Sequence, residues 1–437
     1  MKKIIIILTL FCSYTAQSQN LVNIEVPSIV VHRMEMAIQK ANALPVPSWC
    51  NTMELKQNRK IIIEKCIKTL YHNYMPPEGA VLYEGVMPSV SIYRGLWSWD
   101  SWKHAYSLAY IDKELAENSV RSMYAYQNEA GMIADCIFAD KEKNNWRNTK
   151  APLSAWAVYE IYNATKDTGF LKEMYPKLLK YHYWWFADRD HDKNGICEFG
   201  CTDGSIQAAR WECWDNAIRF DSIVMIKNSN NAFSMDVESV DLNAYLYLEK
   251  DILITIATIL NDNTKAKSLI AEKTKLGELI RKLFFNKKDG FYYDVNLKDK
   301  SFILSKEASG WLPLFAGIAT KEQAAKIKDM MMNENVFNTF VPLSVAGKDN
   351  PKYEPDGYWR GPVWLDQFYF GYMGLKRYGY DKEAESLLLK LLQNAPNITS
   401  TSDVALREYY NSKTGEGLGT QYFGWTAAHL LMMMLDK

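Results

Sequence analysis

Segment 211–221, with the sequence WECWDNAIRFD, combines three carboxylates, one arginine and two tryptophans. Tryptophan rings beside a carboxylate create a partly dry environment, which raises the pKa of a carboxyl group. Such a group can hold a proton near neutral pH, so we predict that Asp215 is a general acid. The rest of the chain would then place a sugar, and a second carboxylate, opposite it. A purely structural role is also open, with Asp215 capping a helix and the tryptophans filling the core.

Four other loops repeat this combination, because each places carboxylates or arginines beside tryptophan or tyrosine. They are residues 94–100, 144–152, 356–364 and 407–417. Asp and Arg form paired hydrogen bonds with sugar hydroxyls, and the C–H face of a sugar packs on an indole ring. Together the loops predict a carbohydrate site, although Asp100 could instead cap its helix and Trp364 could fill the core. The predicted substrate-binding residues are Trp99, Asp100, Trp146, Arg147, Trp214, Arg219, Trp359, Arg360 and Trp364.

The overall composition is that of a globular protein without a net charge. Of the 437 residues, 48% are hydrophobic and 23% are charged, and 51 basic residues balance 51 acidic ones. This balance provides no electrostatic footprint for nucleic acid or for an anionic membrane, so we predict neither as a partner. The 14 tryptophans and 27 tyrosines are typical of a protein that stacks on sugar rings. A neutral or weakly charged ligand is the better match.

The first twenty residues have the pattern of an export signal. Two lysines precede an apolar run over residues 4–14, and small or polar residues follow at 16–18. We predict a signal peptide over residues 1–18, an N-terminal extension over 19–52, and a periplasmic or secreted protein. The apolar run is too short to span a bilayer, and no other stretch approaches 18 apolar residues. The later cysteines permit disulfides, but we expect mostly free, buried thiols.

From residue 53 onward, two kinds of helix alternate. The first kind is aromatic or small around most of its circumference, which is typical of a helix buried on nearly all sides. It recurs at residues 99–110, 152–159, 240–247, 308–315, 361–368 and 424–431. The second kind is charged and amphipathic, as in an outer layer, and occurs at residues 53–74, 114–127, 171–186, 265–285, 321–331 and 382–392. Six inner and six outer helices predict an all-α fold, an (α/α)6 barrel or toroid, over residues 53–437.

Strand signals are few. Residues 290–295 and 301–304 predict a minor β-hairpin as an accessory feature. The loops that precede the inner helices would gather at one end of the toroid, where rigidly mounted loops commonly carry function.

Four segments resemble those of glycoside hydrolase family 63, the processing α-glucosidase family, and more distantly those of family 37 trehalases. They are residues 97–104, 214–220, 358–364 and 408–426, and the resemblance extends from about residue 93 to the C-terminus. It implies an (α/α)6 barrel that hydrolyses an α-glycosidic bond with inversion. It further implies that Asp215 is the general acid and Glu408 the general base. Inversion requires two carboxyls on opposite faces of the sugar, roughly 6.5–9.5 Å apart.

The preferred function is therefore an exported inverting α-glycosidase, with an α-glucosidase acting on oligosaccharides as the first choice. A trehalase or an α-mannosidase-like hydrolase of small α-glycosides is an alternative on the same barrel. Two other classes stay open: a sugar-binding protein without activity, and a polysaccharide lyase, which would use Tyr or His as its base. No organic cofactor is predicted, and the sequence leaves the oligomeric state undetermined.

Residues 190–198, with the sequence DHDKNGICE, follow the first nine positions of a calcium-binding loop. Such a loop has oxygen ligands at positions 1, 3 and 5, glycine at 6, a backbone carbonyl at 7 and an acidic residue at 9. Position 12 is Cys201, where a bidentate Glu would be required. A polar turn is the alternative, and a bound Ca²⁺ would have a structural role. The predicted ligands are Asp190, Asp192, Asn194, Ile196 and Glu198.

Overall fold

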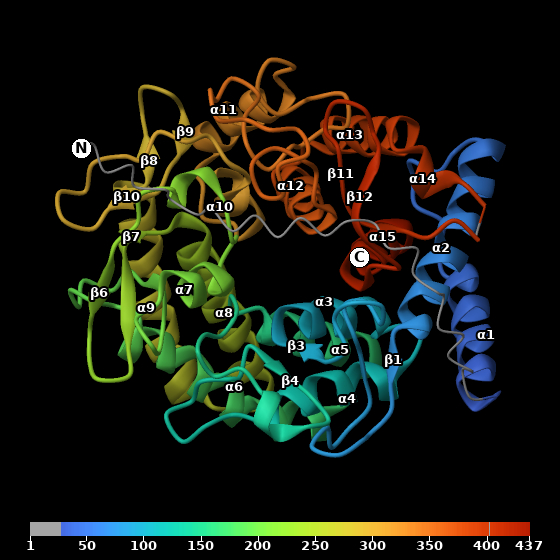
Figure 1. The fold of residues 1–437 in the computed structure, drawn as a ribbon, viewed down its shortest axis with the longest axis horizontal. Coiled ribbons are helices and arrows are strands. Elements are labelled where there is room, and N and C mark those ends of the chain that lie inside the picture. Colours follow the sequence, from blue (N-terminus) through green and yellow to red (C-terminus); the bar gives the residue numbers. More distant parts are fainter. Residues whose placement is uncertain (1–27, 402) are drawn as a thin grey trace, which may run out of the picture.

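The computed structural model describes residues 28–401 and 403–437 as a mostly helical protein (Figure 1). The predicted signal peptide, and part of the predicted N-terminal extension, lie outside these residues. The remainder of the extension contains a helix, α1 (Ser28–Ala43), which packs on α2 (Met53–His72). Among the described helices, none combines the length and apolar character needed to cross a membrane. The six described cysteines are free and buried, in agreement with the expectation of thiols.

Six inner helices contact one another in a closed ring. Each inner helix contacts the next along the chain, and the last, α15, contacts the first, α3 (Figure 1). Every residue of α3 and α15 is buried, as expected for helices that are apolar around most of their surface. The sequence therefore located the inner layer correctly. The inner helices are α3 (Ser98–Leu108), α5 (Ser154–Thr165), α8 (Val240–Ile259), α10 (Leu312–Phe315), α12 (Leu365–Arg377) and α15 (Gly424–Leu435).

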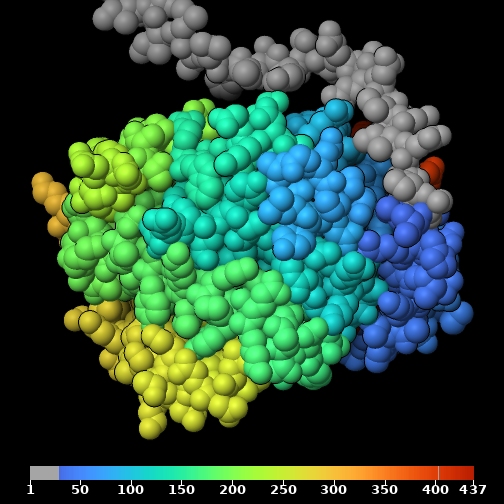
Figure 2. Space-filling model, turned by 90° about the horizontal axis from the view of Figure 1, so that it is seen from below, coloured from blue at the N-terminus to red at the C-terminus, as the bar shows by residue number. Residues whose placement is uncertain are grey.

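The amphipathic helices lie outside this ring, and side chains cap the N-termini of several of them. Asp112, Asp167 and Asp262 each accept a hydrogen bond from a backbone N–H of the first helical turn. Figure 2 shows the outside of the molecule from one side, with the N-terminal helices in blue beside residues in cyan and green. The outer helices are α2, α4 (Lys113–Tyr124), α6 (Thr168–Asp188), α9 (Asn263–Leu283), α11 (Lys321–Met332) and α13 (Asp381–Asn394).

The inner helix predicted at 308–315 is much shorter than the others. Its first turn is a 3-10 helix, η3 (Ala308–Trp311), and α10 adds a single α-helical turn. Gly317 follows with φ at +75°, a left-handed conformation that ends the helix at low cost.

The predicted hairpin at 290–295 and 301–304 is present only in part. β9 (Phe291–Tyr292) pairs with the preceding β8 (Phe285–Asn286), and Val295 contacts Phe302 only through an isolated bridge. β10 (Val295–Asn296) instead joins a four-stranded sheet. In this sheet β7 (Phe233–Glu238) pairs with β10, β5 (Glu198–Cys201) and β6 (Met225–Lys227). β5 and β10 are short and lie far from β7 in sequence, so no local pattern revealed their pairing with it.

Three further strand pairs support the loops at the cavity described below. β1 (Tyr74–Met75) pairs with β2 (Gly85–Val86), and β3 (Leu96–Trp97) pairs with β4 (Cys136–Ile137). β11 (Arg407–Tyr410) and β12 (Gly417–Gln421) form a hairpin immediately before α15. The remaining short helices are α7 (Ile206–Glu212), α14 (Pro396–Thr399), η1 (Lys141–Lys143) and η2 (Ile218–Phe220).

Candidate active site

A cavity of about 860 Å³ lies where the loops preceding the inner helices meet, and both predicted catalytic carboxylates line it. Its wall is rich in aromatic side chains. This volume is within the usual range for a site that binds a small molecule. Five of the predicted substrate-binding residues also line the cavity: Trp99, Asp100, Trp146, Arg147 and Trp359.

Asp215 lies between α7 and η2 in an unusual backbone conformation, with φ at +25°. Non-glycine residues adopt positive φ mainly where the surrounding structure imposes it, and such strain concentrates at functional sites. Its backbone N–H donates to the Arg210 carbonyl at 3.1 Å. The adjacent Asn216 donates to the Gly357 carbonyl at 3.1 Å and accepts from the Trp359 N–H at 3.0 Å. The acid loop, residues 211–221, is therefore held against the loop before α12.

Glu408 lies on β11 and is only 5% exposed. Its Oε2 accepts a hydrogen bond of 2.9 Å from the Thr420 N–H on β12. Gly419 approaches so closely that a Cβ atom there would lie 2.4 Å from this Oε2, and its φ is +68°. Glycine is therefore required at position 419 for Glu408 to keep this position.

Burial raises the pKa of both carboxyls. The pKa of Asp215 rises to about 6, and the positive charge of Lys150 limits this increase. The pKa of Glu408 rises to about 7, with the Thr420 N–H opposing the effect of burial and the Asp100 and Asp215 charges adding to it. Both carboxyls therefore titrate near neutral pH, and the order of their pKa values, Asp215 below Glu408, is the reverse of what an acid Asp215 and a base Glu408 need in the free protein.

Several residues outside the predicted set also line the cavity. Asp135, Lys150, Tyr358 and Trp425 belong to this group. Tyr358 and Trp425 lie in segments that already resembled family 63, so their aromatic character was an available signal. Asp135 has no comparable motif around it. Its position in the cavity depends on β4, a strand of two residues.

Trp214 and Trp364 do not line the cavity but stack on a residue that does. The Trp359 ring lies 5.2 Å from the Trp214 ring and 4.2 Å from the Trp364 ring, with interplanar angles of 21° and 4°. Arg360 also lies outside the lining. It pairs with Asp221 at 2.8 Å and donates to the Asn216 carbonyl at 3.0 Å. These three residues position the wall and the acid loop.

Arg219 is likewise outside the cavity and is 4% exposed. Its guanidinium lies 2.7 Å from Asp241 on α8, 3.0 Å from Asp294 and 3.4 Å from Glu307. It also covers the Trp214 ring, at 4.4 Å from the ring centroid. Arg219 thus joins the acid loop to the inner ring instead of contacting the cavity.

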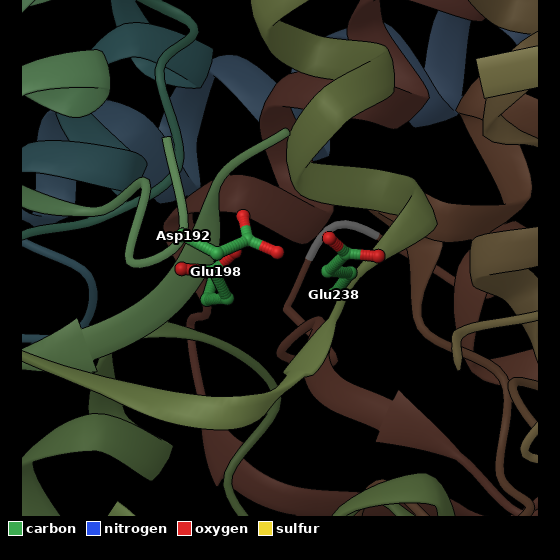
Figure 3. A group of neighbouring side chains, drawn as sticks. All are labelled: Asp192, Glu198 and Glu238. Carbon is green, nitrogen blue, oxygen red and sulfur yellow. The ribbon is translucent and has the colours of Figure 1, made fainter. Parts of the chain in front are cut away.

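The predicted calcium loop contributes two of its residues to a cluster of three carboxylates (Figure 3). Asp192 and Glu198 approach Glu238 of β7 so that one oxygen of each lies within 4.8 Å of the others. Oε1 of Glu198 and Oε2 of Glu238 are buried without a hydrogen-bond partner, so this donor set suits a hard cation. The Lys300 ammonium lies 3.0 Å from Asp192 and 2.7 Å from Glu238. The calcium-loop pattern covers only neighbouring residues, so it could not predict the contribution of Glu238, which lies forty residues after Glu198.

The other predicted ligands have different partners. The two carboxylate oxygens of Asp190 accept from the backbone N–H groups of Asn194 and Gly195, both at 3.0 Å. The side-chain oxygen of Asn194 accepts from the Ile196 N–H at 2.7 Å. These bonds shape the loop, and Ile196 is buried within it.

Comparison with known proteins shows the family of this chain. Residues 93–426 match the family model of the mannosylglycerate hydrolase MGH1-like glycoside hydrolase domain. The chain is 24% identical to mannosylglycerate hydrolase MGH1 of Selaginella moellendorffii, over 84% of each chain. It is 22% identical to a glucosylglycerate hydrolase of Mycolicibacterium hassiacum, over 78% of this chain and 92% of that one. A solved GH63 mannosylglycerate hydrolase from Thermus thermophilus superposes with a TM-score of 0.70 at 21% identity, covering 84% of this chain and 99% of that one. The chain therefore belongs to the MGH1-like glycoside hydrolases of family GH63.

Proposed function

We propose that the protein is an inverting α-glycosidase in which Asp215 is the general acid and Glu408 is the general base. The observation that carries this proposal is the presence of two carboxyls, the partly buried Asp215 and the buried Glu408, on separate elements in one cavity with aromatic walls. In this mechanism Asp215 protonates the leaving-group oxygen while Glu408 takes a proton from water, which attacks the opposite face of the sugar. The closed ring of six inner helices supports the (α/α)6 interpretation of the fold. Export stays a prediction from the N-terminal pattern.

The proposed substrates are small α-glycosides of the glycosylglycerate type. The relatives named mannosylglycerate and glucosylglycerate hydrolase align over most of their own lengths as well as most of this chain. Arg147 and Lys150 lie beside the acid loop, where a leaving group with a carboxylate would depart. An α-glucosidase of oligosaccharides is the second candidate, favoured by the similarity of segments 97–104 and 358–364 to processing α-glucosidases.

Proton NMR of the sugar released in the first minutes tests this proposal. The panel contains α-mannosylglycerate, α-glucosylglycerate, maltose, trehalose and an α-mannobiose. We expect the β-anomer first, because water attacks the face opposite the α-linked leaving group, and the fastest turnover on a glycosylglycerate. Early release of the α-anomer would contradict inversion. Preference for maltose over both glycerate derivatives would favour the second candidate.

We further propose that the cluster of Asp192, Glu198 and Glu238 binds a structural Ca²⁺. Support comes from the two unpartnered buried oxygens, and such an ion would link the loop after α6 to β7. Since β5 and β7 flank the segment that contains Asp215, the ion would stiffen the support of the acid loop.

Chelation is expected to lower the melting temperature of the wild-type protein. Binding to the folded state alone adds about 2.7 kcal/mol when free Ca²⁺ is about 100 times its Kd. A Glu238→Gln protein should show no response to chelator or added Ca²⁺. Asp299→Asn, which removes an exposed carboxylate next to Lys300, should respond as the wild type does. An unchanged wild-type melting temperature on chelation would show that the Lys300 ammonium, and not a bound ion, balances the negative charge of the cluster.

A further inference from the structure

Lys150 is a partly buried cation among the carboxylates of the cavity. Its side chain is 12% exposed, and its Nζ lies 3.4 Å from Oδ1 of Asp135. The same ammonium donates to the backbone carbonyl of Trp211, the residue at which the acid loop begins. Lys150 therefore touches both the wall formed by β4 and the loop that carries Asp215.

The charges around Lys150 keep it protonated. Burial alone would lower its pKa, but the negative charges of Asp135, Asp215 and Asp100 raise its pKa above the ordinary value. In return, the Lys150 charge lowers the pKa of Asp135 and of Asp215. Burial raises both pKa values by more, so each remains above its ordinary value. The titratable or charged groups that act on Asp215 or Lys150 from neighbouring elements are Tyr93, Asp100, Lys103, Asp135, Cys136, Arg210, Cys213, Tyr358 and Glu408.

Besides the ion pairs of Arg219, two attachments of different kinds hold the acid loop beside the cavity. On the side of α12 it is held by the hydrogen bonds of Asn216 and Arg360 described above. On the side of α7 the Trp211 carbonyl bonds to the Lys150 ammonium. Lys150 brings a full charge into the cavity lining, whereas Arg360 does not line the cavity.

We propose that Lys150 is a positioning residue for the general acid: held by Asp135, its ammonium anchors the Trp211 carbonyl and sets the charge environment in which Asp215 meets the leaving group. This inference rests on the proposed role of Asp215 as the acid. In this arrangement the Lys150 cation lowers the pKa of Asp215, and the Asp135 anion raises it.

The pH dependence of kcat/KM separates this role from simple packing. Activity that needs a protonated Asp215 is lost as pH rises through the pKa of Asp215. Removing a nearby cation raises that pKa, so Lys150→Gln should move the alkaline limb upward by about one pH unit. Lys150→Arg keeps the positive charge, so the alkaline limb should stay at the wild-type pH. Asp135→Asn removes an anion and should move the same limb downward. Lys141→Gln, an exposed lysine on η1 changed in the same way, is the matched control and should leave the profile as it is.

Each result decides between the roles. Shifts of opposite sign in Lys150→Gln and Asp135→Asn, with retention in Lys150→Arg, would support the inference, because general damage to the fold cannot reverse sign. If Lys150→Gln does not fold, the downward shift in Asp135→Asn and the unchanged limb in Lys150→Arg still test it. An alkaline limb that stays fixed in Asp135→Asn and in any folded Lys150→Gln would overturn it. If Asp215→Asn itself keeps full activity, the proposed function fails instead, whatever the Lys150 variants show.

Discussion

Asp215→Asn is expected to reduce kcat about 10²- to 10⁴-fold on a glycoside with a poor leaving group, because the departing oxygen then receives no proton. The loss should be much smaller on a dinitrophenyl α-glycoside, since this leaving group departs as a stable anion without protonation. The measurement is kcat and KM for both substrates with the wild type and the variant. Melting temperatures of the two proteins verify that the fold is intact.

Glu408→Gln is the complementary variant. It should lose activity to a similar extent on both substrates, because water needs a base whichever leaving group departs. Asp140→Asn is the matched control, since Asp140 is exposed beside η1 and does not line the cavity. Equal losses for Asp215→Asn on the two substrates would contradict its role as acid. If instead the loss of activity in Glu408→Gln depended on the leaving group, Glu408 would be the acid and Asp215 the base.

Arg219→Met is expected to destabilise the fold by about 3–5 kcal/mol, because it leaves buried carboxylates without their cation. Each residue of this cluster is at most 4% exposed, so water cannot replace the guanidinium. The cluster consists of Arg219, Asp241, Asp294 and Glu307. The control is Arg121→Met, which removes a partly exposed arginine paired with Glu173 and should cost about 1 kcal/mol or less. Urea unfolding of the three proteins measures the difference.

This destabilisation should also depend on pH. In the wild type, burial raises the pKa of Asp294 to about 6 and that of Glu307 to about 7, while the Arg219 charge opposes both increases. Without Arg219 these values rise further. A folded-state pKa above the unfolded one means that the native state gains stability as pH falls. The deficit of Arg219→Met should therefore be larger at pH 8 than at pH 5. An equal deficit at both values would indicate lost packing on Trp214 rather than lost charge.

The helical layers could be predicted because their signal is local. Residues of α3 and α15 are aromatic, small or aliphatic around most of each helix, whereas α9 and α13 carry charged residues between apolar ones, and both patterns follow from burial. The short strands could not be predicted in this way. β5, β7 and β10 have few residues each, and they pair across separations of many residues, so their partners depend on the folded chain.

The order of buried and amphipathic helices, and the chemistry available to the loops, could be read from residue type and periodicity. A chain carries these properties before it folds, and they include the carboxylates of Asp215 and Glu408. Which loop side chains face the cavity is a property of the folded chain alone. Trp359 lines the cavity whereas Trp214 and Trp364 stack behind it, and Lys150 reaches across to the acid loop. The physical reason is that a side chain's direction in a loop follows from contacts between segments far apart in the chain, and neighbouring residues do not encode those contacts.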